Sequence, residues 1–132
     1  MKIIVLVLGA CLLMHCSIQK KAITHVTLKE KEDSLSIKPN ANFAVEIPVQ
    51  SGTGYTWEFD ALSVQSKLMG RNTASMPATE DSTAMVGGPV LEVFTFKAPA
   101  AFREETLTFT LRRPWEKNNT PADVRVLRLK RL

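Results

Sequence analysis

The sequence predicts an all-β protein built as an antiparallel β-sandwich of six to eight strands. Apolar residues in the body of the chain recur with a period of two, which places them on one face of a strand. Turn residues separate these short runs, and no segment carries the apolar stripe of an amphipathic helix. The 132 residues are 45% hydrophobic and 23% charged, which is typical of one ordinary globular domain.

The strands follow one another from residue 35 onward, each with one buried and one solvated face. Their apolar members are, in chain order, Leu35 and Ile37; Phe43, Val45, Ile47 and Val49; Tyr55, Trp57 and Phe59; Phe94 and Phe96; Leu107, Phe109 and Leu111; and Val124, Val126, Leu127 and Leu129. In the last run the apolar face switches between Val126 and Leu127, which predicts a β-bulge. Residues 61–69 fit a short helix or an irregular strand. The chain has no internal repeat and no second domain.

The first segment has the pattern of an export signal. Met1 and Lys2 give it a positive start, and residues 3–14 are all apolar or small. This stretch is too short to span a bilayer, which takes about 20 residues. It ends at Cys16, followed by a polar residue, and so resembles a bacterial lipoprotein signal that is cut before Cys16 and carries a lipid on its thiol.

Two alternatives to this processing site stay open. Cys11 follows Leu-Gly-Ala, a better small-residue box than the one in which His15 precedes Cys16, but its apolar run is very short. A plain secretory signal with incidental cysteines is the second alternative. The expected organisation is a lipoprotein-type signal peptide at 1–15, a tether at 16–23 and one domain at 24–132.

Composition excludes several classes of function. The only cysteines are Cys11 and Cys16 and the chain has two histidines, so a Cys-based zinc site or a multi-histidine metal site in the domain is excluded and no cofactor is expected. Removing Lys2 from the 17 basic residues leaves 16 against 13 acidic residues, a mild net charge of +3. The basic residues form no single block and no nucleic-acid motif is present, so nucleic acid is not an expected partner.

Catalysis is not expected either. A Ser–His–acid triad would need His25, the one histidine that remains after processing, and no Gly-x-Ser-x-Gly elbow accompanies it. The carboxylate pairs Glu80–Asp81 and Glu104–Glu105 are adjacent in sequence. Adjacent residues on a strand point to opposite faces, so these pairs are poor candidates for acid–base chemistry.

Three loops have an unusual composition instead. The first, residues 50–57, holds two glycines between two strong strands, where glycine permits positive φ and a close backbone approach. The second, residues 85–90, contains Gly-Gly-Pro. The third, residues 112–116, reads Arg-Arg-Pro-Trp-Glu. Its proline ends the preceding strand, so Trp115 is expected to leave the sheet, and such a Trp is a typical binding anchor.

These three loops, in this order, resemble the chagasin family of cysteine peptidase inhibitors, an immunoglobulin-like sandwich that presents three loops at one end. The family's first loop reads Asn-Pro-Thr-Thr-Gly-Tyr-x-Trp. This chain matches it at Thr53, Gly54, Tyr55 and Trp57 and departs at Gln50, Ser51 and Gly52. The resemblance covers roughly residues 24–132.

The other two loops extend the resemblance. Gly87 and Gly88 match the family's Gly-rich middle loop, in which Val90 stands where a second glycine is common. Residues 113–116 match the family's Arg-Pro-Trp-Glu in full, and Leu111 stands in place of a tyrosine.

The resemblance implies a reversible inhibitor of papain-like cysteine peptidases whose three loops form a wedge in the active-site cleft. In that arrangement the loop around Thr53 lies nearest the peptidase's cysteine, with Gly87–Gly88 along one side of the cleft and Trp115 on the other. The implied peptidase-binding residues are Gly52, Thr53, Gly54, Tyr55, Gly87, Gly88, Arg113, Pro114 and Trp115. No catalytic residue and no cofactor are implied, and we expect an exported monomer, anchored to the bacterial envelope through lipid or else periplasmic or secreted.

Other roles also fit these residues. Gly54 and Gly87 could serve tight turns alone, and Arg113 could be a solvated strand end or a brace for its loop. Trp115 could fold back over the end of the sandwich, whereas Trp57 is expected in the core and Tyr55 in packing that supports the loop. The alternative function is an immunoglobulin-like envelope lipoprotein that binds a glycan or a protein partner.

Overall fold

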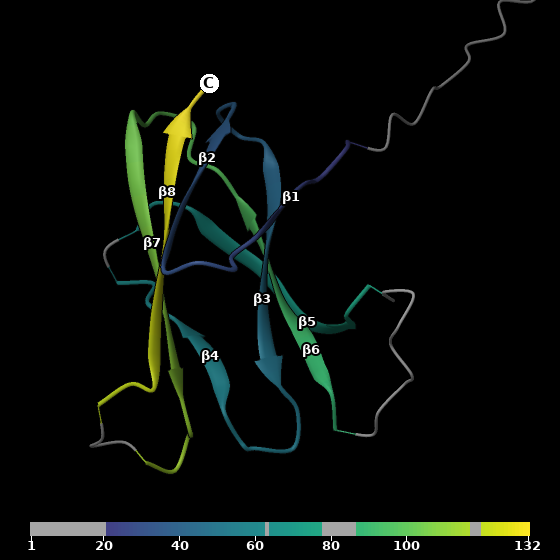
Figure 1. The fold of residues 1–132 in the computed structure, drawn as a ribbon. Coiled ribbons are helices and arrows are strands. Elements are labelled where there is room, and N and C mark those ends of the chain that lie inside the picture. Colours follow the sequence, from purple (N-terminus) through teal and green to yellow (C-terminus); the bar gives the residue numbers. More distant parts are fainter. Residues whose placement is uncertain (1–20, 63, 78–86, 117–119) are drawn as a thin grey trace, which may run out of the picture.

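The protein is described by a computed structural model over residues 21–62, 64–77, 87–116 and 120–132, in which eight strands form two four-stranded sheets (Figure 1). The strands are β1 (Thr24–Thr27), β2 (Glu32–Ile37), β3 (Asn42–Gln50), β4 (Thr56–Phe59), β5 (Lys67–Ser75), β6 (Pro89–Lys97), β7 (Glu104–Arg112) and β8 (Asp123–Arg131). One sheet has the order β1-β3-β6-β5 and the other β2-β8-β7-β4. The predicted all-β sandwich is confirmed. The expected signal peptide, with Cys11 and Cys16, and most of the expected tether lie outside the described residues.

The sandwich is antiparallel in four of its six ladders. The β1–β3 and β2–β8 ladders are parallel, which the expectation of an antiparallel sandwich did not include. Their direction follows from the path of the chain, because successive strands reverse direction and β1 and β2 belong to different sheets. Strands β1 and β3 therefore run the same way, as do β2 and β8.

The core lies between the two sheets and follows the period of two. Most of the fully buried residues come from β3, β6, β7 and β8, and Trp57 of β4 is buried among them at 0% exposure. The Phe59 ring meets Phe96 edge-on across the sandwich, with centroids 4.8 Å apart. The buried core residues all lie between Leu28 and Leu129. The core of the described chain is thus closed within residues 28–129, and both sheets begin after residue 23.

The structure settles the open expectation for residues 61–69. Residues 61–69 form no helix where they are described, and strand β5 begins at Lys67. This strand is exposed at nearly every position and shifts register between Leu68 and Gly70, so it shows no apolar alternation.

The predicted bulge at Val126–Leu127 is wrong, because β7 and β8 pair without a register shift. Leu127 continues the inward period, and Arg125 takes the preceding inward position with its guanidinium 5.0 Å from the centre of the Trp57 ring. Val126 lies on the outer face.

Candidate functional site

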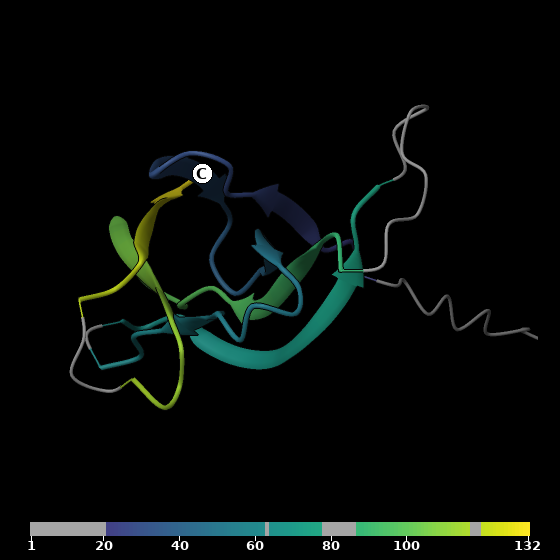
Figure 2. The same ribbon diagram turned by 60° about the horizontal axis from the view of Figure 1, so that its bottom comes forward.

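Three loops meet at the end of the sandwich where β3 ends and β4 begins. The β3–β4 loop (51–55) lies between the described ends of the β5–β6 loop (76–77 and 87–88) and those of the β7–β8 loop (113–116 and 120–122) in both views (Figures 1 and 2). Residues 78–86 and 117–119 of the outer two loops, including Met85 and Val86, lie outside the described residues. The three loops that the sequence singled out are therefore neighbours in space.

The β3–β4 loop is a tight turn held by its own residues. Gly52 and Gly54 have φ values of 77° and 78°, a conformation that other residues adopt at a cost. The Thr53 hydroxyl donates a hydrogen bond of 2.9 Å to the Gln50 carbonyl, across the turn. A Cβ built at Gly52 would meet no atom within 4 Å, so the outer side of this turn is open.

The β7–β8 loop places Trp115 on the first loop. Its backbone turns at once, because the Glu116 N–H donates to the Arg113 carbonyl at 3.0 Å with Pro114 at the second position, where proline is favoured. The Trp115 indole then lies on Gly54, whose added Cβ would come within 2.3 Å of Cη2. Two-thirds of Trp115 (67%) nonetheless remains exposed. One side of the indole thus packs against the first loop, and the other side is exposed to solvent.

Arg113 braces the same two loops. Its guanidinium lies 4.4 Å from the centre of the Tyr55 ring, and its Nε donates a hydrogen bond of 3.2 Å to the Thr53 carbonyl. Tyr55 is half-buried and packs against the core, as expected for a residue that supports the loop. Arg113 therefore braces its loop and is not simply a solvated strand end, the other role expected for it.

The β5–β6 loop is tied to the first loop by two residues at which the sequence departs from the family pattern. The Gln50 side chain donates to the Gly87 carbonyl, and the Ser51 hydroxyl donates to the Gly88 carbonyl at 2.7 Å. Gly87 has a φ of 86°, in the left-handed region. All three loops are therefore joined through the central one.

Beneath the loops, buried Glu92 links the two sheets. It is 6% exposed and accepts hydrogen bonds from the Trp57 backbone N–H at 3.2 Å and the Thr56 hydroxyl at 2.9 Å, and it forms an ion pair with Arg71. A buried carboxylate is tolerated only with such partners. Glu92 of β6 thereby positions the residues that follow the first loop.

Glu92 is not among the site residues predicted from the sequence. The available signal was a charged residue at an inward position, two residues before Phe94. Trp57, by contrast, is in the core as expected, with its indole N–H donating to the Pro48 carbonyl at 3.0 Å.

The remaining titratable residues do not form a second site. His25 lies on β1, where its Nδ1 is 2.7 Å from a Glu46 carboxylate oxygen, and the described residues give the ring no hydroxyl partner. Nor do they hold a group of three or more His, Cys, Asp or Glu side chains that could bind a metal ion. No helix long and apolar enough to cross a membrane occurs in the described part of the chain.

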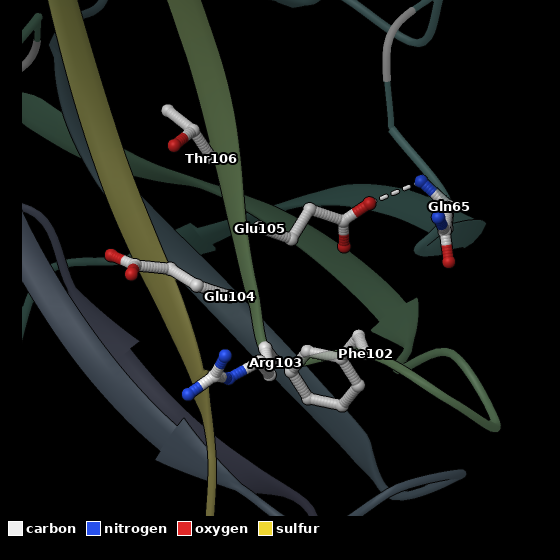
Figure 3. Close-up of a pocket in the computed structure, with 6 residues that line it drawn as sticks. All are labelled: Gln65, Phe102, Arg103, Glu104, Glu105 and Thr106. Atoms are coloured by element: carbon white, nitrogen blue, oxygen red, sulfur yellow. Dashed lines mark hydrogen bonds between the residues drawn. The ribbon is translucent and has the colours of Figure 1, made fainter.

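A hollow of about 370 Å³ lies away from the three loops, around the start of β7 (Figure 3). Its central carboxylate, Glu105, points toward Gln65 and accepts hydrogen bonds from the backbone N–H groups of Gln65 and Ser66. Glu104 points the other way, as expected for adjacent strand residues. Glu105 therefore holds the β4–β5 connection and offers no acid–base pair.

The sequence matches the model of a known protein family. The family model described as "Chagasin family peptidase inhibitor I42" matches residues 36–128. A search of curated proteins finds no match.

Several solved structures share the fold. The crystal structure of the cysteine protease inhibitor EhICP2 from Entamoeba histolytica aligns with a TM-score of 0.65 and 23% identity, over 83% of this chain and 96% of that one. The solution structure of Amebosin aligns with a TM-score of 0.55 and 16% identity, over 84% and 99%. PbICP-C, solved in complex with falcipain-2, aligns with a TM-score of 0.53 and 11% identity, over 83% and 99%.

Proposed function

Because the chain belongs to the chagasin family of peptidase inhibitors, we propose that its three loops enter the active-site cleft of a papain-like cysteine peptidase and block it reversibly. Members of this family inhibit peptidases and are not enzymes. The structural neighbours include a cysteine protease inhibitor and an inhibitor solved with falcipain-2, which supports a cysteine peptidase as the target.

The observation that carries the proposal is the exposed Trp115 held in place on Gly54. A solvent-exposed indole at a loop tip is an unfavourable feature unless a partner covers it, and Trp is among the residues that contribute most to interfaces. Its position is set before binding, because the ring lies on Gly54 and Arg113 of the same loop is hydrogen-bonded to Thr53. Preorganised loops lose little entropy on docking, which favours tight binding.

The central loop is suited to a narrow cleft. Gly52 leaves the outer side of the turn open, so a peptidase can approach its backbone and Thr53 closely. Trp115 on one side and Gly87–Gly88 on the other would then contact the two walls of the cleft. A standard protein–protein interface buries about 1,600 Å² in total, which three loops can supply. The block is competitive because the loops occupy the cleft that substrate needs, and it is reversible because no covalent bond forms.

We also propose that the protein acts outside the cytoplasm. The apolar run at residues 3–14 and the Cys-Ser that follows support export, cleavage before Cys16 and a lipid anchor on its thiol. A monomer suits the wedge, because one sandwich carries all three loops.

Titration of papain with residues 17–132 tests the function. Residual hydrolysis of a small peptide substrate should fall with added domain and recover fully on dilution, and raising the substrate concentration should weaken the inhibition. Papain that keeps full activity in excess domain, or that stays inhibited after dilution, would contradict reversible competitive inhibition.

A further inference from the structure

The end of the sandwich opposite the three loops gathers basic side chains. Here the β2–β3 turn, the β6–β7 turn and the C-terminus lie together, since the Asn40 N–H donates to the Pro99 carbonyl at 3.1 Å and the Leu132 N–H to the Ile37 carbonyl at 2.9 Å. We call this surface the basic end. Its six exposed cations are Lys38, Lys67, Lys97, Arg103, Lys130 and Arg131.

The side chains of these cations have no carboxylate within ion-pair distance in the described part of the chain. None of the six forms an ion pair with another described residue, whereas Arg71, Arg113, Arg125 and Arg128 each pair with a carboxylate. Lys67 and Lys97 are even direct neighbours across the β5–β6 ladder, where like charges repel. A cluster of unpaired cations that repel one another suits an anionic partner.

The acidic residues at this end do not neutralise it. The carboxylates here are fewer than the six cations: Glu105, which accepts a hydrogen bond from Ser66, Glu104, which lies beside Lys130 in the β7–β8 ladder, and the terminal carboxylate of Leu132. A net positive charge therefore remains on a surface a few strands wide.

Exposed apolar side chains lie among these cations. Leu132 is 70% exposed, and Ile23, which precedes β1, is 44% exposed. Thr24 of β1 pairs with Phe43 near the start of β3, so Ile23 belongs to the same end. Cations interleaved with exposed apolar residues are typical of surfaces that rest on the headgroup region of a membrane.

The chain also enters the domain at this end. The start of β1 and the C-terminus both lie away from the three loops (Figure 1). A fully extended segment of seven residues, the length from residue 17 to residue 23, spans at most about 25 Å. A lipid on Cys16 would therefore keep the basic end near the bilayer with the three loops pointing away. This orientation rests on the proposed anchor, while the basic surface itself does not.

We propose that the basic end binds the headgroups of anionic phospholipids. The folded domain then adds its own contact with the membrane to that of the anchor at Cys16, and it presents the inhibitory loops outward. Each basic residue close to an anionic bilayer strengthens binding about fivefold. The attraction is electrostatic, so salt should weaken it strongly.

Vesicle co-sedimentation of residues 17–132 tests this surface without the lipid anchor. We expect binding to vesicles of equal parts phosphatidylglycerol and phosphatidylcholine, little binding to phosphatidylcholine alone, and release by high salt. Lys38→Glu/Lys130→Glu should weaken binding at least about tenfold. The control, Lys29→Glu/Lys31→Glu, makes the same charge change beside Glu46 and Val126 in the middle of the sandwich and should weaken binding less than about twofold.

Inhibition of papain keeps this test separate from the proposed function. Lys38→Glu/Lys130→Glu should inhibit papain like the wild type, and wild-type protein bound to vesicles should still inhibit. Absence of binding to anionic vesicles at low salt would overturn the proposal. An equal loss of vesicle binding in both double variants would also overturn the proposal, because binding would then depend on net charge or on the tether. Loss of inhibition on vesicles would place the loops at the membrane and would overturn it as well.

Discussion

The Trp115 indole lies directly on the backbone of Gly54, so closely that a Cβ at position 54 would come within 2.3 Å of Cη2. This contact joins the first and third loops before any partner is bound. The contact requires glycine at position 54 for a second cause besides its φ of 78°, because only a residue without a side chain leaves room for the Trp115 ring.

Gly54→Ala should therefore displace Trp115. Both Gly54→Ala and Gly52→Ala place alanine at a φ near 78°, which costs about 1–2 kcal/mol of unfolding free energy. Only the first also pushes the indole away. Urea denaturation should show similar losses for the two variants, while acrylamide should quench Trp115 fluorescence more strongly in Gly54→Ala. Equal quenching in both would show that the contact does not hold the ring.

Arg113→Lys should loosen the brace although it keeps the charge. A lysine cannot both lie over the Tyr55 ring and donate in the fixed geometry that reaches the Thr53 carbonyl. We expect inhibition of papain to weaken about tenfold, equivalent to about 1.4 kcal/mol. Arg128→Lys, at the exposed pair with Glu32, is the control and should inhibit normally. Normal inhibition by Arg113→Lys would mean that its charge alone matters.

Ser51→Ala should release the second loop from the first. The Ser51 hydroxyl donates to the Gly88 carbonyl at 2.7 Å, and a hydrogen bond of this kind contributes about 1 kcal/mol. Dissociation from papain, followed by displacement kinetics, should become several times faster. Ser36→Ala, on the exposed side of β2, is the control. An unchanged dissociation rate for Ser51→Ala would show that this bond does not order the binding surface.

Glu92→Gln should destabilise the domain more than Glu46→Gln. The amide at position 92 can still accept from Trp57 but leaves Arg71 without its counter-charge at a site where the Glu92 side chain is 8% exposed. We expect a loss of about 1–3 kcal/mol in urea denaturation. Glu46 is more exposed, at 21%, and pairs with His25, so its substitution should cost less. Equal losses would argue against a special role for the buried link between the sheets.

The sequence predicted those strands in which a period of two separates a buried face from a solvated one. The sequence left the start of β5 undecided between a helix and an irregular strand, because this strand is exposed on both faces at the edge of its sheet. In β8 an inward Arg125 over Trp57 broke the apolar pattern and suggested a bulge that is absent. A local sequence pattern therefore predicts which residues are buried only where the buried residues are apolar and the exposed residues are polar.

The sequence predicted individual residues of the candidate site but not the contacts between them. Pro114 after a strand indicated that Trp115 leaves the sheet, and the structure shows it exposed. The contact between Trp115 and Gly54 and the bond from Ser51 to Gly88 join residues far apart in the chain. Such contacts depend on how the two sheets pack, which no local motif encodes.

A binding surface centred on Trp115 is tested most directly by comparing the inhibition constants of Trp115→Ala and Leu62→Ala against papain. Both replace a large exposed apolar residue, at 67% and 98% exposure, but Leu62 lies outside the three loops. Trp115→Ala should inhibit at least about 30-fold more weakly, a loss of about 2 kcal/mol, with an unchanged melting temperature. Leu62→Ala should inhibit like the wild type. Normal inhibition by Trp115→Ala, or its unfolding, would contradict a binding surface centred on Trp115.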